Sequence, residues 1–191
     1  MRTFDYIFII GVLLVVFGRM RQTLFNKNKS PGIKKEGWTF PTAVIAYNSI
    51  IVGTVVEYII LTREINYKVS IIGFFLEGFG LFLTLSSIKS LGRLWSFAFE
   101  IKEDHKIVKD GVYRYVRHPY YVGVLLEITG FSLFANSYYM LTLALLVLYP
   151  IIILRMILEE KLMTSVFREE YENYKREIRA FFPTTRRNKC E

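Results

Sequence analysis

Residues 138–157 read YYMLTLALLVLYPIIILRMI, and this stretch decides the fold. Its central run, Leu141–Leu154, carries no charge, and a helix over the whole of residues 138–157 is long enough to cross a bilayer. Four other apolar segments suit the same interpretation: residues 4–18, 40–61, 69–88 and 121–135. Only Asn136-Ser137 separates segment 121–135 from segment 138–157, which predicts that these two helices form an antiparallel hairpin. With 52% hydrophobic residues among 191, we expect an all-α integral membrane bundle of about five transmembrane helices, or of four plus a re-entrant helix.

Basic residues are distributed unevenly around these segments. Most of the 25 Lys and Arg residues lie in three regions, which are residues 19–35, 89–117 and 161–189. The opposite face has only Arg2, Arg63 and Lys68. By the positive-inside rule, the three basic regions are cytoplasmic and the N-terminus lies outside, which requires an odd number of crossings.

The net charge of +8 follows from this topology and from attraction to anionic membrane lipids. It does not indicate nucleic-acid binding, since no basic stripe with exposed aromatic residues lies on a soluble domain. Cys190 is the single cysteine, so we expect neither an intrachain disulfide nor a cysteine metal site. The N-terminal segment has no cleavage-site pattern and is expected to remain as a helix.

We expect one domain over residues 1–191, with N-terminal helices in 1–90 and a catalytic core in 91–183. Two carboxylates lie at membrane depth; a structural role is favoured for Glu57, whereas Glu77 is open between a structural role and a polar cavity. The glycines of residues 69–88 are not a dinucleotide fingerprint, because no strand precedes them. They are expected to let helices approach closely, and they are Gly73, Gly78 and Gly80.

The segment after residue 157 changes to an amphipathic pattern. Its apolar residues recur at steps of three and four: Leu162, Met163, Val166, Phe167, Tyr171, Tyr174 and Ile178. This spacing predicts a helix with one apolar face that ends before Pro183. It either lies on the membrane surface or covers the cytoplasmic opening of the bundle, and we favour the second arrangement.

A polar stretch from Glu100 to Val122 holds both histidines, His105 and His118, between two apolar blocks. Lys109-Asp110-Gly111 is a turn, and Pro119 suits the first position of a helix with His118 as its cap. A structural interpretation makes His118 a cap or a buried hydrogen-bonding group. It makes Tyr113, Tyr120 and Tyr121 interfacial aromatic residues.

Arg155 precedes Glu159 by four residues, so the two side chains share one face of the last apolar helix. One interpretation is that Arg155 extends to the membrane interface, helped by Glu159. The other is that Arg155 binds an anionic substrate group, while Glu159 binds a cation or a hydroxyl group. The spacing alone favours neither.

Two motifs resemble the isoprenylcysteine carboxyl methyltransferase family over residues 90–183. The first is His105-Lys-Ile-Val108 followed by Tyr113 and by Arg117-His118-Pro119-Tyr120-Tyr121-Val-Gly123. The second is Arg155-x3-Glu159-Glu160, followed by Phe167-x3-Tyr171-x2-Tyr174 and a Phe-Pro pair. Relatives of this family that share the Arg-His-Pro segment include phospholipid and thiol methyltransferases, and some sterol reductases have a related core.

The resemblance implies that S-adenosylmethionine binds in a cytoplasm-facing pocket, which the C-terminal helix covers. It implies a lipophilic or prenylated acceptor that enters from the bilayer, with Arg155 binding the methyl-accepting group. The residues expected to hold the donor are Glu100, His105, Lys106, Ile107, Val108, Tyr113, Arg117, His118, Pro119, Tyr120 and Glu159.

Three functions follow as hypotheses. The first is methyl transfer to the carboxylate of a prenylcysteine-like acceptor, which is already ionised at neutral pH and needs no general base. The second is transfer to a phospholipid amine or to a thiol; an ammonium acceptor must first lose a proton, for which Glu160 or His118 could serve as the base. The third is a nicotinamide-dependent reductase of the sterol type or a non-catalytic membrane protein. Neither the oligomeric state nor the host membrane follows from the sequence.

Overall fold

A computed structural model of the chain describes residues 3–26, 33–34, 37–61, 63–96, 100–101 and 106–184. Side chains are described for residues 4–22, 37–61, 63–96 and 106–184. In chain order the elements are α1 (Thr3–Asn26), β1 (Ile33–Lys34), α2 (Thr39–Ile60), α3 (Tyr67–Leu91), η1 (Gly92–Leu94), β2 (Glu100–Ile101), η2 (Gly111–Arg114), α4 (Pro119–Phe134), α5 (Tyr138–Leu143), η3 (Ala144–Leu148), α6 (Tyr149–Phe167) and α7 (Glu169–Glu177). The two strands form only a short antiparallel pair.

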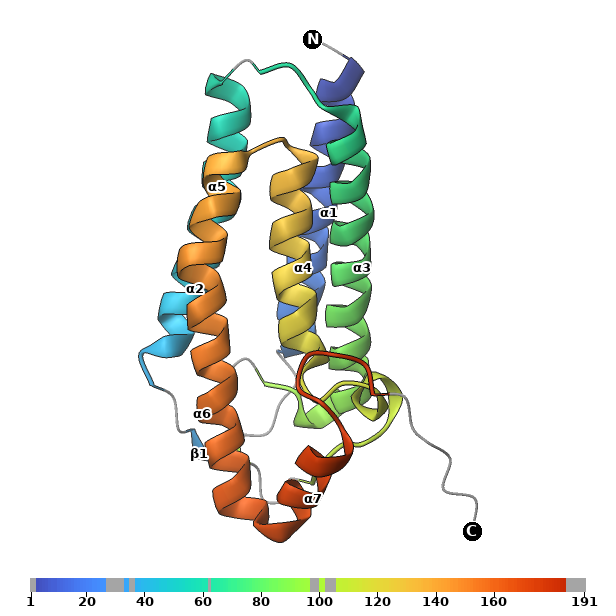
Figure 1. Ribbon diagram of the computed structural model, residues 1–191, viewed down its shortest axis with the longest axis vertical. Helices are drawn as coiled ribbons and strands as arrows, with labels where there is room; N and C mark the ends of the chain where they lie inside the picture. The colour runs from blue at the N-terminus through green and yellow to red at the C-terminus, as the bar shows by residue number, and fades with distance from the viewer. Residues whose placement is uncertain are drawn as a thin grey trace.

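The predicted membrane bundle is confirmed: the long helices lie side by side along one axis (Figure 1). In the described part of the chain, three helices are long and apolar enough to cross a membrane, at Thr39–Ile60, Tyr67–Leu94 and Tyr138–Phe167. A shorter apolar helix covers Pro119–Phe134. The chain is therefore a multi-pass membrane protein, and its orientation in the membrane stays a prediction.

The last apolar helix runs without a break from Tyr138 to Phe167, although Pro150 lies inside it. Proline has no N–H to donate, and its ring crowds the carbonyl four residues earlier. The turn before it, Ala144–Leu148, widens into a π-helix, which gives that carbonyl room. Pro150 is thus accommodated by a change of helical pitch.

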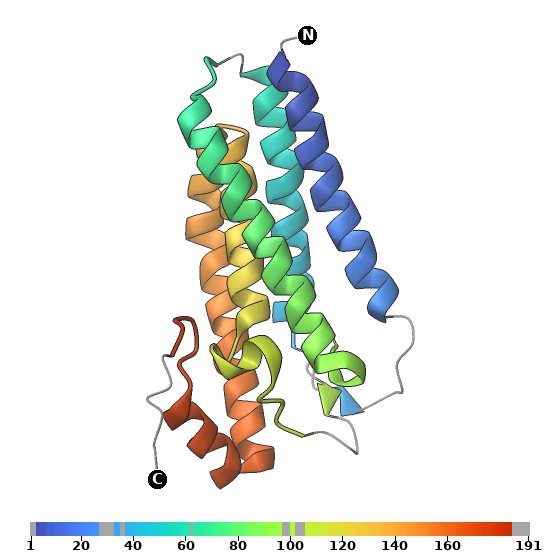
Figure 2. The same ribbon diagram turned by 90° about the vertical axis from the view of Figure 1, so that its right-hand side faces the viewer.

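Glycines allow α3 and α4 to pack backbone against backbone, and Figure 2 shows α3 crossing the face of α4. A Cβ atom on Gly80 would lie 2.7 Å from the carbonyl oxygen of Gly123, and one on Gly130 would lie 2.7 Å from that of Gly73. This contact confirms the prediction for Gly73 and Gly80. The prediction was wrong for Gly78, whose Cβ would meet nothing within 4 Å.

One end of the bundle, which we name the hairpin end, contains the α2–α3 connection and the turn between α4 and α5 (Figure 1). Asn136 adopts a positive φ of 53° in that turn. The Glu57 carboxylate accepts bonds from the backbone N–H groups of Tyr139 and Met140, at 3.3 and 3.1 Å, and from the Ser137 hydroxyl. Arg63 pairs with it at 3.2 Å. Glu57 therefore caps α5, in agreement with the structural role that was favoured.

Two helix boundaries differ from the sequence expectation. α1 continues to Asn26, so Arg19 and Arg21 lie in a helix and not in the first loop. The C-terminal amphipathic segment is divided at Arg168, whose φ of 47° ends α6 and turns the chain into α7. Because of this turn, α7 folds back against the end of the bundle opposite the hairpin end (Figure 1). We name this second end the cavity end, after the pocket described below.

Candidate active site

A cavity of about 390 Å³ lies near the cavity end of the bundle. Its lining comes from helices α1, α2, α3, α4 and α6 and from the turns between them. The lining residues are Arg19, Phe40, Ala43, Val44, Tyr47, Asn48, Leu91, Trp95, Ser96, Tyr113, Arg117, His118, Tyr120, Tyr121, Val124, Leu148, Ile152, Arg155 and Glu159. Its size falls in the range of small-molecule sites, and its walls are mostly apolar with a few charged groups.

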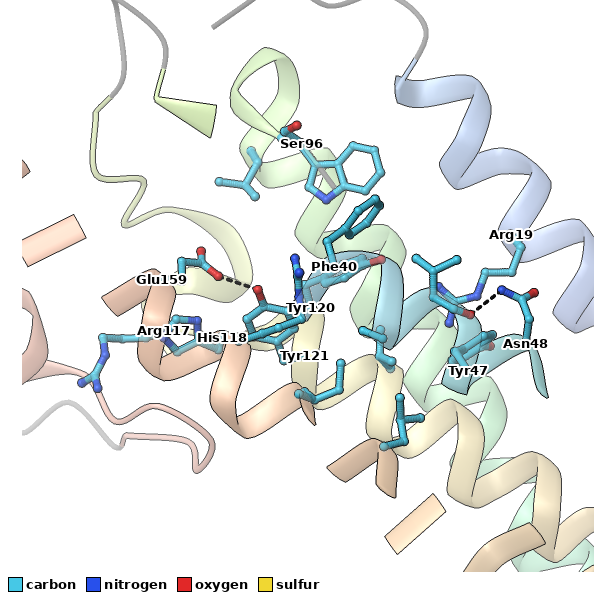
Figure 3. A pocket seen from close by; sticks show the side chains of 18 of the residues that line it. Arg19, Phe40, Tyr47, Asn48, Ser96, Arg117, His118, Tyr120, Tyr121 and Glu159 are labelled. Atoms are coloured by element: carbon cyan, nitrogen blue, oxygen red, sulfur yellow. Dashed lines mark hydrogen bonds between the residues drawn. The ribbon is translucent and has the colours of Figure 1, made fainter. Parts of the chain in front are cut away.

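Arg155 and Glu159 contribute a positive and a negative group to the cavity wall from successive turns of α6. Arg155 is only 4% exposed, its guanidinium lies 5.2 Å from the centre of the Phe40 ring, and its Nη1 donates to Thr39 Oγ1 at 3.5 Å. The Glu159 carboxylate accepts a 2.6 Å bond from the Tyr121 hydroxyl (Figure 3). Arg155 therefore points into the protein, and the interpretation that it extends to the membrane interface was wrong.

Aromatic rings form one side of the cavity. Tyr120 lies between Trp95 and Tyr121, with ring centres 6.1 and 6.0 Å apart, and Tyr121 stacks on His118 at 5.7 Å. Burial and the nearby charge of Glu159 raise the pKa of Tyr113 well above its ordinary value, so this phenol stays neutral. Aromatic faces attract cations, and in this cavity they stand beside the carboxylate of Glu159.

His118 has the expected position but not the expected contact. It is the N-cap residue of α4 and Pro119 is the first helical residue, but the His118 side chain makes no capping bond. Its Nε2 instead lies 2.8 Å from Glu160 Oε1. The same oxygen accepts bonds from Arg117 Nε and Nη2 at 3.2 and 2.8 Å. His118 is thus a buried hydrogen-bonding group.

Arg117 joins α6 to the segment after α7. Its Nη1 donates to the carbonyl oxygens of Lys175 and Ile178, at 2.9 Å for the former, while its backbone N–H donates to Arg179 O at 3.0 Å. The Tyr174 hydroxyl donates to Tyr113 O at 2.7 Å. These bonds hold α7 against the segment that forms the cavity wall. Within the described residues, α7 covers this segment from outside and adds no lining residue itself.

The structure brings six of the predicted site residues to the cavity: Tyr113, Arg117, His118, Tyr120, Arg155 and Glu159. Lys106, Ile107, Val108 and Pro119 are not among its described lining residues; Lys106 is exposed, and Ile107 packs on the Tyr171–Tyr174 cluster. The backbone of Glu100 lies in β2, and its side chain is outside the described residues, as is all of His105. Contact of any of these residues with a donor stays a prediction.

Sequence reasoning missed the contribution of the first two helices. Arg19 was placed in a loop, and Phe40 and Tyr47 are indistinguishable by pattern from other aromatic residues of a membrane helix. Glu127, which pairs with Arg19 at 3.0 Å, was also missed. A carboxylate inside the segment 121–135 is the same signal that identified Glu57 and Glu77, so this residue could have been found.

Comparisons with known proteins show the family to which the chain belongs. A family model described as phospholipid methyltransferase matches residues 69–170, which is more than half of the chain. The chain belongs to this family. The match contains every predicted site residue.

Curated members and relatives support the resemblance to the isoprenylcysteine carboxyl methyltransferases. The protein-S-isoprenylcysteine O-methyltransferase of Schizosaccharomyces pombe is 32% identical over 119 residues, or 61% of this chain and 50% of the relative. The enzyme of that name from Saccharomyces cerevisiae is 28% identical over 116 residues, or 60% and 48%. The cobalt-zinc-cadmium resistance protein CzcN of Cupriavidus metallidurans is 34% identical over 101 residues, or 51% and 45%. The chain thus spans about half the length of the curated relatives that it matches.

Proposed function

We propose that the protein is a membrane methyltransferase that uses S-adenosylmethionine to methylate the carboxylate of a lipophilic acceptor, of the prenylcysteine type. The observation that carries this proposal is the placement of Arg155 and Glu159 on one face of α6, opposite an aromatic wall, in a largely apolar cavity. The names of the two yeast relatives support the same chemistry.

The residues at the cavity end suit the methyl donor. Its sulfonium group is a cation, and the rings of Tyr120 and Tyr121 with the Glu159 carboxylate provide the surroundings that stabilise a positive charge. Arg117 and His118 keep the wall in place through Glu160, while their backbone groups bond to Arg179 and Ala180. We also propose that the predicted residues of segment 106–120 contact the donor directly. They are Lys106, Ile107, Val108, Tyr113, Arg117, His118, Pro119 and Tyr120.

The bound donor supplies an activated methyl group, and the protein's contribution is to position the acceptor. Arg155 presents a planar guanidinium that can hold a carboxylate through two parallel hydrogen bonds. A carboxylate is already ionised at neutral pH, so no side chain has to remove a proton. The apolar walls, including Val124, Leu148 and Ile152, exclude water and receive the acceptor's hydrocarbon part.

An amine or a thiol acceptor is the alternative in the same class. Deprotonation of an ammonium group would require a base in the cavity, and Glu160 and His118 were the candidates. Glu160 is not among the described lining residues, and its Oε1 is engaged by Arg117 and His118. His118 does line the cavity, but its Nε2 is the atom bonded to Glu160. Because these bonds engage both candidate bases, the arrangement favours a carboxylate acceptor. A rate that rises with pH through the acceptor's own pKa would instead indicate the amine or thiol.

The proposal includes an orientation. We place the N-terminus outside, and the cavity end, α7 and the C-terminus in the cytoplasm, where the donor is available. Residues 91–183 would form the catalytic core and residues 1–90 the supporting helices. Membrane lipids and a lipophilic or prenylated substrate are the partners we expect.

Ligand-dependent thermal stability tests the donor. Detergent-purified protein should gain stability when S-adenosylhomocysteine is added, since a ligand that binds only the folded state raises the unfolding temperature. NADPH at the same concentration should leave that temperature unchanged. Stabilisation by NADPH alone would contradict the proposal and favour a reductase.

A further inference from the structure

Arg19 brings a further guanidinium group to the cavity, beside those of Arg117 and Arg155, and it comes from α1, which lies outside the family match at residues 69–170. Figure 3 shows Arg19, Tyr47 and Asn48 together at one end of the cavity, while Glu159, Arg117 and His118 lie at the other. The cavity thus has two ends. Residues within the family match form the end at which we propose the donor to bind, and helices α1 and α2 contribute the labelled residues of the other end.

The Arg19 side chain is held in a fixed position. Its Nη2 donates to Glu127 Oε2 at 3.0 Å and its Nη1 to Gln22 Oε1 at 2.7 Å, and the guanidinium lies 3.8 Å from the centre of the Tyr47 ring. The Glu127 carboxylate also accepts bonds from Thr84 Oγ1 at 2.7 Å and from the Tyr47 hydroxyl at 3.3 Å. A guanidinium fixed in this way is ready to bind a ligand without first losing side-chain freedom.

The guanidinium, and not its carboxylate partner, faces the cavity. The Arg19 side chain is 27% exposed and lines the cavity, whereas that of Glu127 is 5% exposed and is absent from the described lining. Since Glu127 balances the charge of Arg19, this end suits a neutral oxygen acceptor better than a second full negative charge. Amide and ester carbonyl groups have this chemistry.

Arg19, Tyr120 and Arg155 all line this one cavity. A ligand that occupies the cavity can therefore contact both of these arginines.

We propose that Arg19 determines acceptor specificity by binding a carbonyl oxygen close to the reacting carboxylate, so that the acceptor is recognised at two points. This inference rests on the proposed function. The acceptor, and not the donor, is assigned to Arg19 because the residues predicted to bind the donor lie at the opposite end of the cavity.

A pair of acceptors tests the proposal: N-acetyl-S-farnesylcysteine, and S-farnesyl-3-mercaptopropionate, which lacks the acetamido group but keeps the thioether, the chain and the carboxylate. The ratio of their kcat/KM values is measured for the natural protein and for R19Q/E127Q, in which an amide pair replaces the ion pair. We expect the natural protein to prefer the acetamido acceptor and the variant to lose at least about tenfold of that preference, mainly through KM. R19K, which keeps the charge without the planar fork, provides a milder second variant and should lose part of it.

R21Q is the matched control, because Arg21 is an exposed arginine of the same helix and is absent from the described lining residues. It should keep the natural ratio of acceptors. An unchanged ratio of acceptors in both R19Q/E127Q and R19K would overturn the proposal. Variants that bind S-adenosylhomocysteine more weakly but keep the natural ratio of acceptors would also overturn it. If the natural protein binds S-adenosylhomocysteine but methylates neither acceptor, the proposed carboxylate acceptor itself fails, and the inference fails with it.

Discussion

The two ends of the bundle place charged groups in apolar surroundings in opposite ways. At the hairpin end, Glu57 bonds to Ser137, Tyr139, Met140 and Arg63, and the nearby cavity holds only about 10 Å³. At the cavity end, charged side chains line a space of about 390 Å³. Both arrangements satisfy the rule that charges inside a membrane protein need partners or a polar cavity. The difference indicates that the first end is built for structure and the second for binding.

Replacement of Arg155 should have the largest effect. R155A should reduce methyl transfer by about 10³-fold, or roughly 4 kcal/mol, because the acceptor loses the group that orients its carboxylate. S-adenosylhomocysteine should stabilise the variant as it stabilises the natural protein. R168A is the matched control, since Arg168 is an exposed arginine at the end of the same helix. Equal losses of turnover and donor binding in R155A would contradict the separate roles assigned to Arg155 and Glu159.

The corresponding change at the hairpin end should affect stability and not chemistry. E57A should lower the free energy of unfolding by about 3 kcal/mol, because it removes the carboxylate that pairs with Arg63 and accepts bonds from the first turn of α5. Denaturant unfolding of the detergent-solubilised protein measures this change, with exposed Glu64 as the control in E64A. If E57A instead keeps its stability and loses activity, the contrast between the two ends is wrong.

Glu160 combines features of the two ends. It lies beside the cavity, as the binding residues do, but its described bonds to Arg117 and His118 are structural. E160Q should weaken its bonds to Arg117 and His118, cost about 1.5 kcal/mol and release α7 from the cavity wall. Faster proteolysis within Glu169–Glu177, reversed by S-adenosylhomocysteine, would measure this release. A change in the pH profile of turnover without faster proteolysis would favour a role as general base.

A smaller effect is expected at high pH. Burial raises the pKa of Tyr171 and of Tyr174 above the ordinary value near 10, so the folded protein keeps these phenols neutral while the unfolded chain ionises. Stability is therefore retained below about pH 10 and falls above it, by about 1.4 kcal/mol per pH unit for each tyrosine. Y171F should reduce the difference between unfolding temperatures at pH 9 and pH 10.5. An equal difference between the two unfolding temperatures in the natural protein and in Y171F would exclude Tyr171 as a cause of the lost stability at high pH.

The sequence was informative where one interaction determines the result. Apolar length placed the helices, Pro119 marked the start of α4, and close-packing glycines were recognised at Gly73 and Gly80. The spacing of Arg155 and Glu159 put both on one face of α6, as the cavity lining has them. These features depend on local geometry or on hydrophobicity, which a sequence states directly.

Features that depend on contacts between distant segments could not be predicted. Nothing near Arg19 in the sequence indicates that Glu127, 108 residues away, accepts its hydrogen bond. The turn at Arg168 is set by the docking of α7 on Tyr113 and Arg117, and a positive φ at an arginine has no local signal. The bond of His118 to Glu160 likewise replaced the capping bond that its position had suggested.

The chemical form of the product tests the central claim most directly. The protein is incubated with S-adenosylmethionine labelled in its methyl group and with N-acetyl-S-farnesylcysteine, the acceptor that we expect it to prefer, and the labelled product is then treated with mild base. A carboxyl methyl ester hydrolyses and releases volatile labelled methanol, which is the predicted result, and R155A should release almost none. Label that stays bound to a base-stable product, or the absence of any transfer while S-adenosylhomocysteine still binds, would contradict methylation of a carboxylate held by Arg155.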